Sequence, residues 1–294
     1  MKRLLTVSNV ILILSAIIFS IYMAPGCVLA DSGKDDPEYQ EYMRDLKQAA
    51  AEKRLEESRE TVEEAYGVDE KSTFTPHHLN YAIIGKNNAL TQISFKYRLG
   101  RDWNTYLAFT NVVKWDIYES SNPYYDINFK PEIFYRFTPE LEDLISVDVG
   151  FWHESNGRDN EESRSWDQLF ARFNTLFEIN SMALAWETHL YYELNTGGTN
   201  EDIGDYLGWW DTAFYLLNIL PTEKFNIDLE FYIWSGESGI PFKQGQFRTG
   251  LIYKMENAVF QPSLYVQYFN GYGEVMADYD VRTEDWRIGL VFLY

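Results

Sequence analysis

Residue types that could perform nucleophilic catalysis lie close together in two short segments near the middle of the chain. The first segment reads F-W-H-E-S-N-G-R (residues 151–158), and the second reads S-R-S-W-D (residues 163–167). A serine hydroxyl becomes an effective nucleophile when a neutral imidazole takes its proton, and a carboxylate can orient that imidazole. We therefore consider Ser155 as nucleophile, His153 as base and Asp167 as the orienting acid.

The alternation of polarity along both segments predicts where these three groups point. Successive side chains of a strand point to opposite faces. From residue 145 the odd positions are apolar until His153 and Ser155, whereas the even positions are mostly small or polar. Asp167 likewise begins an apolar face of odd positions that runs to Phe177. All three groups thus lie at the ends of apolar stripes, and such stripes are typical of the lipid-facing wall of a barrel. This placement indicates an enzyme that acts on the membrane itself.

The spacing of His153 and Ser155 alone is a weak signal. Two residues span about 6.5 to 7 Å along a strand, a distance that local bending could shorten to hydrogen-bond reach. The alternative reading is a surface histidine beside a serine, and the composite of both segments favours catalysis instead. Gly157 allows close approach of the backbone, so its amide is a candidate donor to the oxyanion of an ester-hydrolysis intermediate.

The composition favours a transmembrane barrel. Aromatic residues make up 17% of the chain, with 22 Tyr and 9 Trp, yet the mean hydropathy is −0.35. Barrels place Tyr and Trp in girdles at both membrane interfaces and keep a polar interior. The formal net charge of −20 argues against a nucleic-acid partner and would attract divalent cations.

Three regions follow from the ends of the chain. Residues 1–30 are interpreted as a secretory signal peptide, because two basic residues precede an apolar run and a V-L-A site. A retained membrane anchor is the alternative, and Cys27 raises lipoprotein processing, although the preceding A-P-G lacks the usual leucine. Residues 31–72 are expected to form a charged, helical or partly disordered periplasmic extension, and residues 73–294 the barrel.

The fold class expected is all-β, a transmembrane antiparallel β-barrel of about twelve strands. Runs of about ten residues with alternating polarity repeat after Leu79, separated by turn-rich loops. The last run ends on the aromatic Tyr294, as in barrels that close with such a strand. We place the strands at 79–86, 90–99, 104–117, 127–137, 143–155, 165–179, 182–194, 206–218, 225–234, 244–254, 258–270 and 283–294.

The two segments together resemble the signature of the outer-membrane phospholipase A family. The motif reads H-x-S-N-G-R, then a short spacer, then S-R-S-W. The likeness extends over about residues 74–294, with S-x-P-Y at 121–124 and Y-x-G-W at 206–209. One position departs from the pattern, because the family's best-known members carry Asn where this chain has Asp167. The resemblance implies a calcium-dependent enzyme of the Gram-negative outer membrane that hydrolyses sn-1 and sn-2 acyl esters of phospholipids and lysophospholipids and is active as a homodimer.

The resemblance also implies a ligand set for Ca²⁺. The ion would be held by the backbone carbonyl of Arg158, by Ser163, and by Ser121 from a second subunit. The acidic loop at 159–162 independently offers hard oxygen ligands, although it could be a merely solvated loop.

Asn111 lies on the outward stripe of the third predicted strand. A lone amide facing lipid is costly unless it is paired, so Asn111 suggests a subunit contact, and it matches a polar residue that the family uses in dimerisation. The alternative is that the register is wrong and Asn111 faces the lumen. The rival function is a non-enzymatic barrel such as a porin or an adhesion scaffold, and a soluble secreted esterase is a third option.

Overall fold

The computed structural model describes residues 37–66, 73–100, 103–141, 143–179, 182–219, 226–237, 239, 243–254 and 262–292. The predicted signal peptide, Cys27 and Tyr294 lie outside these residues. By its internal contacts the chain divides into two units, Met1–Ala50 and Ala51–Tyr294. Helix α2 (Pro37–Tyr66) begins in the first unit and ends in the second.

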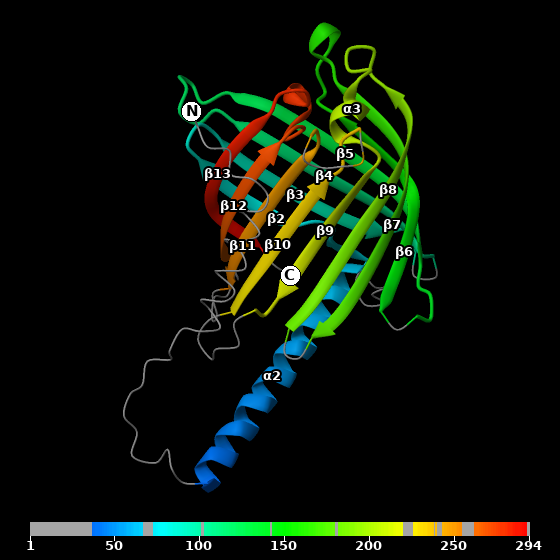
Figure 1. Ribbon diagram of the computed structural model, residues 1–294. Helices are drawn as coiled ribbons and strands as arrows, with labels where there is room; N and C mark the ends of the chain where they lie inside the picture. Colours follow the sequence, from blue (N-terminus) through cyan, green and yellow to red (C-terminus); the bar gives the residue numbers. More distant parts are fainter. Residues whose placement is uncertain are drawn as a thin grey trace. The chain divides into compact units, whose positions relative to one another are not determined.

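Twelve antiparallel strands close into a barrel in the second unit, which confirms the expected fold class (Figure 1). Each strand pairs with the next, and closure is completed where β13 pairs with β2, as in Ile288 opposite Ile84. The strands are β2 (Asn80–Gly85), β3 (Ala89–Arg98), β4 (Thr105–Trp115), β5 (Tyr124–Phe137), β6 (Leu144–Ser155), β7 (Ser165–Ile179), β8 (Met182–Thr196), β9 (Trp210–Leu217), β10 (Asn226–Trp234), β11 (Gln246–Lys254), β12 (Pro262–Gly271) and β13 (Thr283–Phe292).

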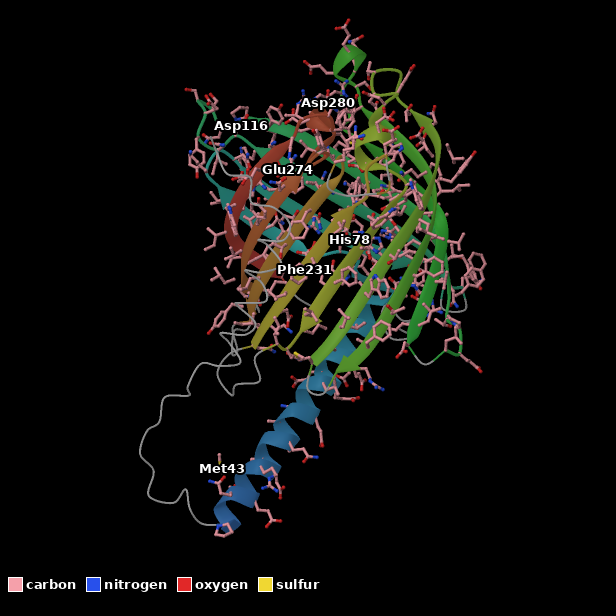
Figure 2. All side chains as sticks on the ribbon, viewed as in Figure 1. Met43, His78, Asp116, Phe231, Glu274 and Asp280 are labelled. Carbon is pink, nitrogen blue, oxygen red and sulfur yellow. The ribbon has the colours of Figure 1, made fainter. Side chains whose placement is uncertain are left out.

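The barrel wall has an apolar outside and a largely polar inside, with side chains projecting from both faces (Figure 2). Outward residues such as Ile93 and Val149 are exposed, whereas Arg136 and Asp148 are buried inside and joined by two hydrogen bonds of 2.7 Å. Buried charges of this kind are stable when they are paired and hydrogen-bonded. The polarity pattern is that of an outer-membrane barrel, and the expected location in the outer membrane of a Gram-negative bacterium agrees with it.

One predicted strand begins too early. The strand expected at 206–218 starts at Trp210, because Ile203–Leu207 forms the short helix α3. Ile203 and Leu207 are four residues apart and both buried, which is helical rather than strand spacing. Gly208, with φ of +77°, then ends the helix in a conformation that favours glycine.

A short additional strand, β1 (Phe74–Pro76), pairs with β3 beyond the end of β2. Two 3-10 turns, η1 (Asn160–Glu162) and η2 (Met276–Asp278), lie in the loops that follow β6 and β12. None of the helices in the described residues is long and apolar enough to cross a membrane.

Candidate active site

The register of β6 and β7 brings two of the three predicted catalytic residues face to face. His153 lies directly opposite Asp167, and its Nδ1 is 2.6 Å from Oδ1 of Asp167. An ionised carboxylate can only accept a hydrogen bond, so Nδ1 carries the hydrogen and Nε2 is left with the lone pair of a base. The structure therefore contains an oriented imidazole of the kind expected.

Both side chains lie on the outer wall and are only partly covered. The side chain of His153 is 34% exposed and that of Asp167 is 25% exposed. Ser155 is half-buried and, two residues after His153, lies on the same outward face. Their neighbours Glu154 and Trp166 are buried on the inner face, so the predicted parity of both strands is correct.

Asn195 is a further residue of this cluster that the sequence analysis did not single out. Its Nδ2 donates to Oδ2 of Asp167 over 3.2 Å, so the carboxylate is held from two sides. A register irregularity in the β7–β8 ladder next to Asp167 places Asn195 opposite it. The predicted strand ends at 194, two residues before the observed end at Thr196, and therefore leaves out Asn195.

The loop between β6 and β7 is closed by Asn156. This side chain is buried, its Nδ2 donates to the carbonyl of Glu162 at 2.9 Å, and its Oδ1 accepts from the amide of Arg164 at 2.9 Å. The Asn156 amide also donates to the Arg164 carbonyl at 3.1 Å. These bonds hold the two ends of the loop together, so the segment after Ser155 has a defined path.

Gly157 occupies a backbone conformation that requires glycine. Its φ is +65°, and a Cβ added there would lie 3.0 Å from the ring of Phe129. A larger residue would be strained at this position, whereas glycine lets the backbone turn directly after the nucleophile candidate. The role of the Gly157 amide as an oxyanion donor stays a prediction.

The start of β7 is fixed by a second asparagine. Asn200 is fully buried, its Nδ2 donates to the carbonyl of Ser165 at 2.9 Å, and its Oδ1 accepts from the Ser165 amide at 3.2 Å. From the loop 197–202, Asn200 thus braces the strand that carries Asp167. A buried asparagine in a loop gives no periodic signal, so the sequence pattern did not reveal it.

Comparison with known proteins decides the family. Residues 58–292 match the sequence profile described as phospholipase A1. The chain belongs to the phospholipase A1 family. The resemblance inferred from the two motif segments is thereby confirmed.

Curated relatives in this family share a little over a quarter of their residues with the chain. Phospholipase A1 of Salmonella typhimurium is 28% identical over 192 residues, which cover 63% of this chain and 60% of the relative. The putative phospholipase A1 of Neisseria meningitidis serogroup B is 26% identical over 217 residues, covering 68% and 53%. The matched part of the chain thus spans about 60% of the length of the first relative.

Solved structures show the same fold. Outer membrane phospholipase A from Escherichia coli superposes with a TM-score of 0.62 at 22% identity, covering 75% of this chain and 98% of that one. The Salmonella typhi outer membrane phospholipase dimer with bound calcium gives a TM-score of 0.61 at 22% identity, covering 76% and 93%. At this identity the likeness establishes the barrel architecture.

Two of the three expected calcium-ligating residues lie on the loop that Asn156 closes. The guanidinium of Arg158 pairs with Glu162 at 3.0 Å, and the Ser163 carbonyl accepts from Thr199 and from Arg164. Carbonyl and hydroxyl oxygens on such a loop fit the hard-oxygen preference of Ca²⁺.

Ser121 lies in the turn between β4 and β5, where its φ is +68°. In the part of the chain that the structure describes, no hydrogen bond or ion pair joins Ser121 to Arg158 or Ser163.

Asn111 faces outward, as expected from parity. It is half-buried between the inward-facing Thr110 and Val112, which are buried. Its Nδ2 donates to the carbonyl of Asn128 on β5 at 3.0 Å. This bond meets part of the hydrogen-bonding need of the amide within one chain, and the role of Asn111 in a subunit contact stays a prediction.

The loops at this end of the barrel are joined by an aromatic contact. Arg164 lies over the ring of Tyr279, with 5.8 Å from Cζ to the ring centre, and the Tyr279 hydroxyl donates to Asp202 at 2.5 Å. Burial and the hydrogen bond to Asp202 raise the pKa of the Tyr279 hydroxyl, so it stays protonated at neutral pH. The contact links the loop after Ser155 to the loops after β8 and β12.

Proposed function

We propose that this chain is a calcium-dependent outer-membrane phospholipase A that hydrolyses sn-1 and sn-2 acyl esters of phospholipids and lysophospholipids. The observation that carries the proposal is the 2.6 Å pair of His153 and Asp167 on the lipid-facing wall, with Ser155 on the same face. Because the base His153 and the nucleophile Ser155 lie on the outer wall, they would contact an ester in the membrane rather than one in a water-filled lumen. Family membership supports the same chemistry.

In the proposed mechanism, Nε2 of His153 takes the hydroxyl proton of Ser155 while the serine oxygen attacks the acyl carbonyl. Asp167 stabilises the resulting imidazolium, and the Gly157 amide donates to the tetrahedral oxyanion. His153 then returns the proton to the departing glycerol oxygen, which leaves an acyl-serine. A water molecule, deprotonated by the same imidazole, attacks the acyl-serine and releases the fatty acid and the free serine.

Calcium would supply positive charge beside the oxyanion, held by Ser163 and the carbonyl of Arg158 in one chain and by Ser121 of a second. On this proposal two chains are needed for a complete site, and Asn111 contributes to their contact. The homodimer would also form a groove along which an acyl chain can lie. The proposal of a shared site is supported by the outward position of Asn111 on β4 and by the position of Ser121 in the turn that follows β4.

The rival, a non-enzymatic porin, is disfavoured by the interior of the barrel. Arg136, Arg172 and Arg287 are fully buried there and bound to carboxylates. A cavity of about 110 Å³ lies among charged and aromatic side chains inside the barrel. A barrel filled in this way gives little room for solute passage.

The deciding experiment measures fatty-acid release from mixed phospholipid–detergent micelles by the purified chain, with Ca²⁺ and with a chelator. We expect release in Ca²⁺, loss of release with chelator, and no release by Ser155→Ala or His153→Ala, while both variants keep the heat-modifiable mobility of a folded barrel. Full activity of Ser155→Ala would exclude the proposed nucleophile. Absence of any release by the wild-type chain would favour the non-enzymatic alternative.

A further inference from the structure

The segment between β1 and β2 departs from the regular ladder in a way that gathers potential metal ligands inside the barrel. Pro76 pairs with Phe95 and Tyr81 pairs with Gln92, so five steps along one strand oppose three along the other. The additional residues free the segment from strict alternation. As a result the consecutive residues His77 and His78 lie with their rings 4.1 Å apart, instead of on opposite faces of the wall.

Both imidazoles meet one carboxylate of β5. Oε1 of Glu132 is 3.0 Å from Nε2 of His77 and 3.8 Å from Nε2 of His78, and the three ligand atoms all lie within 4.8 Å of one another. A tetrahedral Zn²⁺ with ligands at about 2.0 to 2.1 Å keeps neighbouring ligand atoms about 3.3 Å apart. The two observed separations bracket this value, so small side-chain movements suffice to bring the atoms to one ion.

The surroundings orient the carboxylate. Arg172 donates to the other oxygen of Glu132 at 2.7 Å, which turns Oε1 toward the histidines. The same guanidinium lies 3.5 Å from Nε2 of His77, 3.5 Å from Asp148 and 3.9 Å from Glu187, so a metal ion on His77 requires the guanidinium to turn toward these two carboxylates. A hydrogen-bonded partner of a ligating carboxylate also tunes metal binding.

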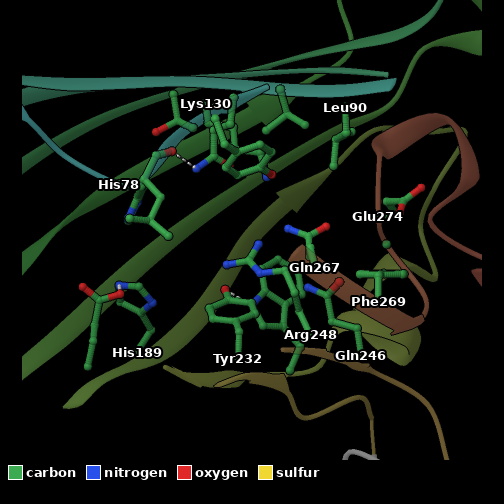
Figure 3. A pocket seen from close by; sticks show the side chains of 18 of the residues that line it. His78, Leu90, Lys130, His189, Tyr232, Gln246, Arg248, Gln267, Phe269 and Glu274 are labelled. Atoms are coloured by element: carbon green, nitrogen blue, oxygen red, sulfur yellow. Dashed lines mark hydrogen bonds and ion pairs between the residues drawn. The ribbon is translucent and has the colours of Figure 1, made fainter. Parts of the chain in front are cut away.

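The group is reachable from the lumen. His78 and Glu132 line the cavity of about 110 Å³, and the side chain of His78 is 27% exposed (Figure 3). An ion can therefore enter, and a water molecule has room to serve as a fourth ligand. Trp152 lines the same cavity.

We propose that His77, His78 and Glu132 bind a divalent transition-metal ion of the Zn²⁺ type inside the barrel. The site differs in chemistry from the hard-oxygen calcium site of the outer loops, because imidazole nitrogen favours Zn²⁺ over Ca²⁺. The ion would join the segment before β2, which carries both histidines, to β5, which carries Glu132. The proposal is independent of the phospholipase activity.

The test uses the full chain without a histidine tag, stripped with a chelator and returned to detergent buffer. Zn²⁺ is titrated calorimetrically in the presence of excess Ca²⁺, which saturates oxygen-ligand sites, and bound zinc is counted by mass spectrometry after gel filtration. We expect one zinc ion per chain and a tenfold or greater loss of affinity in His78→Gln. The control variant His153→Ala removes a histidine on the outer wall, outside the group, and should keep the wild-type stoichiometry.

Glu132→Gln also breaks the contact with Arg172, so its folding is checked by heat-modifiable mobility before its zinc affinity is interpreted. His78→Gln, which alters the most exposed member of the group, keeps the proposal testable if Glu132→Gln does not fold. The Co²⁺ absorption spectrum gives a second readout, and its ligand-field bands should be lost in His78→Gln. Zinc-free wild-type protein, or equal zinc affinity in wild type and His78→Gln, would show instead that the group is an ion-pair network without metal.

Discussion

Truncation of Asp167 tests how far the observed geometry accounts for catalysis. Asp167→Ala removes the 2.6 Å bond that fixes the imidazole of His153, and also the partner of Asn195. A hydrogen bond to a charged group is worth about 1.5–3 kcal/mol, which corresponds to about 10- to 150-fold in rate at 1.4 kcal/mol per tenfold. A quarter of the Asp167 side chain is exposed, so water can partly replace it, and the loss should stay below the upper end of this range, at about 10²-fold.

Asp167→Asn is the matched variant, since it restores the residue type that the resemblance associates with the family. Its Oδ1 can accept from Nδ1 of His153, but its Nδ2 then faces the donor of Asn195, so the Asn195 amide must turn over. We expect Asp167→Asn to retain most of the activity. The assay is initial-rate hydrolysis of phospholipid in mixed micelles at saturating Ca²⁺, with the folded fraction measured by gel mobility. Equal rates for wild type and Asp167→Ala would refute the orienting role.

Three further predictions concern the nucleophile, the loop and the subunit contact. Ser155→Ala should form no acyl-enzyme with a reactive ester probe, as measured by intact mass, whereas wild type gains one acyl group. Asn156→Ala should remove the two side-chain hydrogen bonds that join the ends of the loop, at about 0.5–1.5 kcal/mol each, so limited proteolysis should cut the loop faster and activity should fall at least tenfold. Calcium should shift the wild type from monomer to dimer in analytical ultracentrifugation; Ser121→Ala should weaken this response, and Asn111→Ala should weaken dimerisation even at saturating Ca²⁺. Full activity of a chelated monomer would contradict the shared calcium site.

Alternating polarity was sufficient to predict the wall of the barrel and the direction of its side chains. The strand expected at 165–179 has those bounds in the structure, and His153 and Asp167 face outward as the odd positions required. The reason is physical: a slip by one residue would turn buried charges such as Arg172 toward lipid, so the register is strongly specified.

Features that depend on contacts between distant segments could not be predicted in the same way. Asn195 reaches Asp167 only because of a ladder irregularity, and Asn200 braces β7 from a loop. The pairing of His77 and His78 with Glu132 likewise depends on the break between β1 and β2. None of these arrangements has a period that a single strand displays.

The position of the candidate site on the outer wall depends on anchors inside the barrel. Between His153 and Ser155, Glu154 points inward and pairs with Lys130 at 2.8 Å. Immediately before Asp167, the buried Trp166 donates its indole N–H to Glu193 at 3.1 Å. Each outward group of the site is thus adjacent to an inward residue with a specific partner. Because strand side chains alternate, fixing the inward residues also fixes the outward ones, and a polar interior can hold a hydrolytic pair in register at the lipid surface.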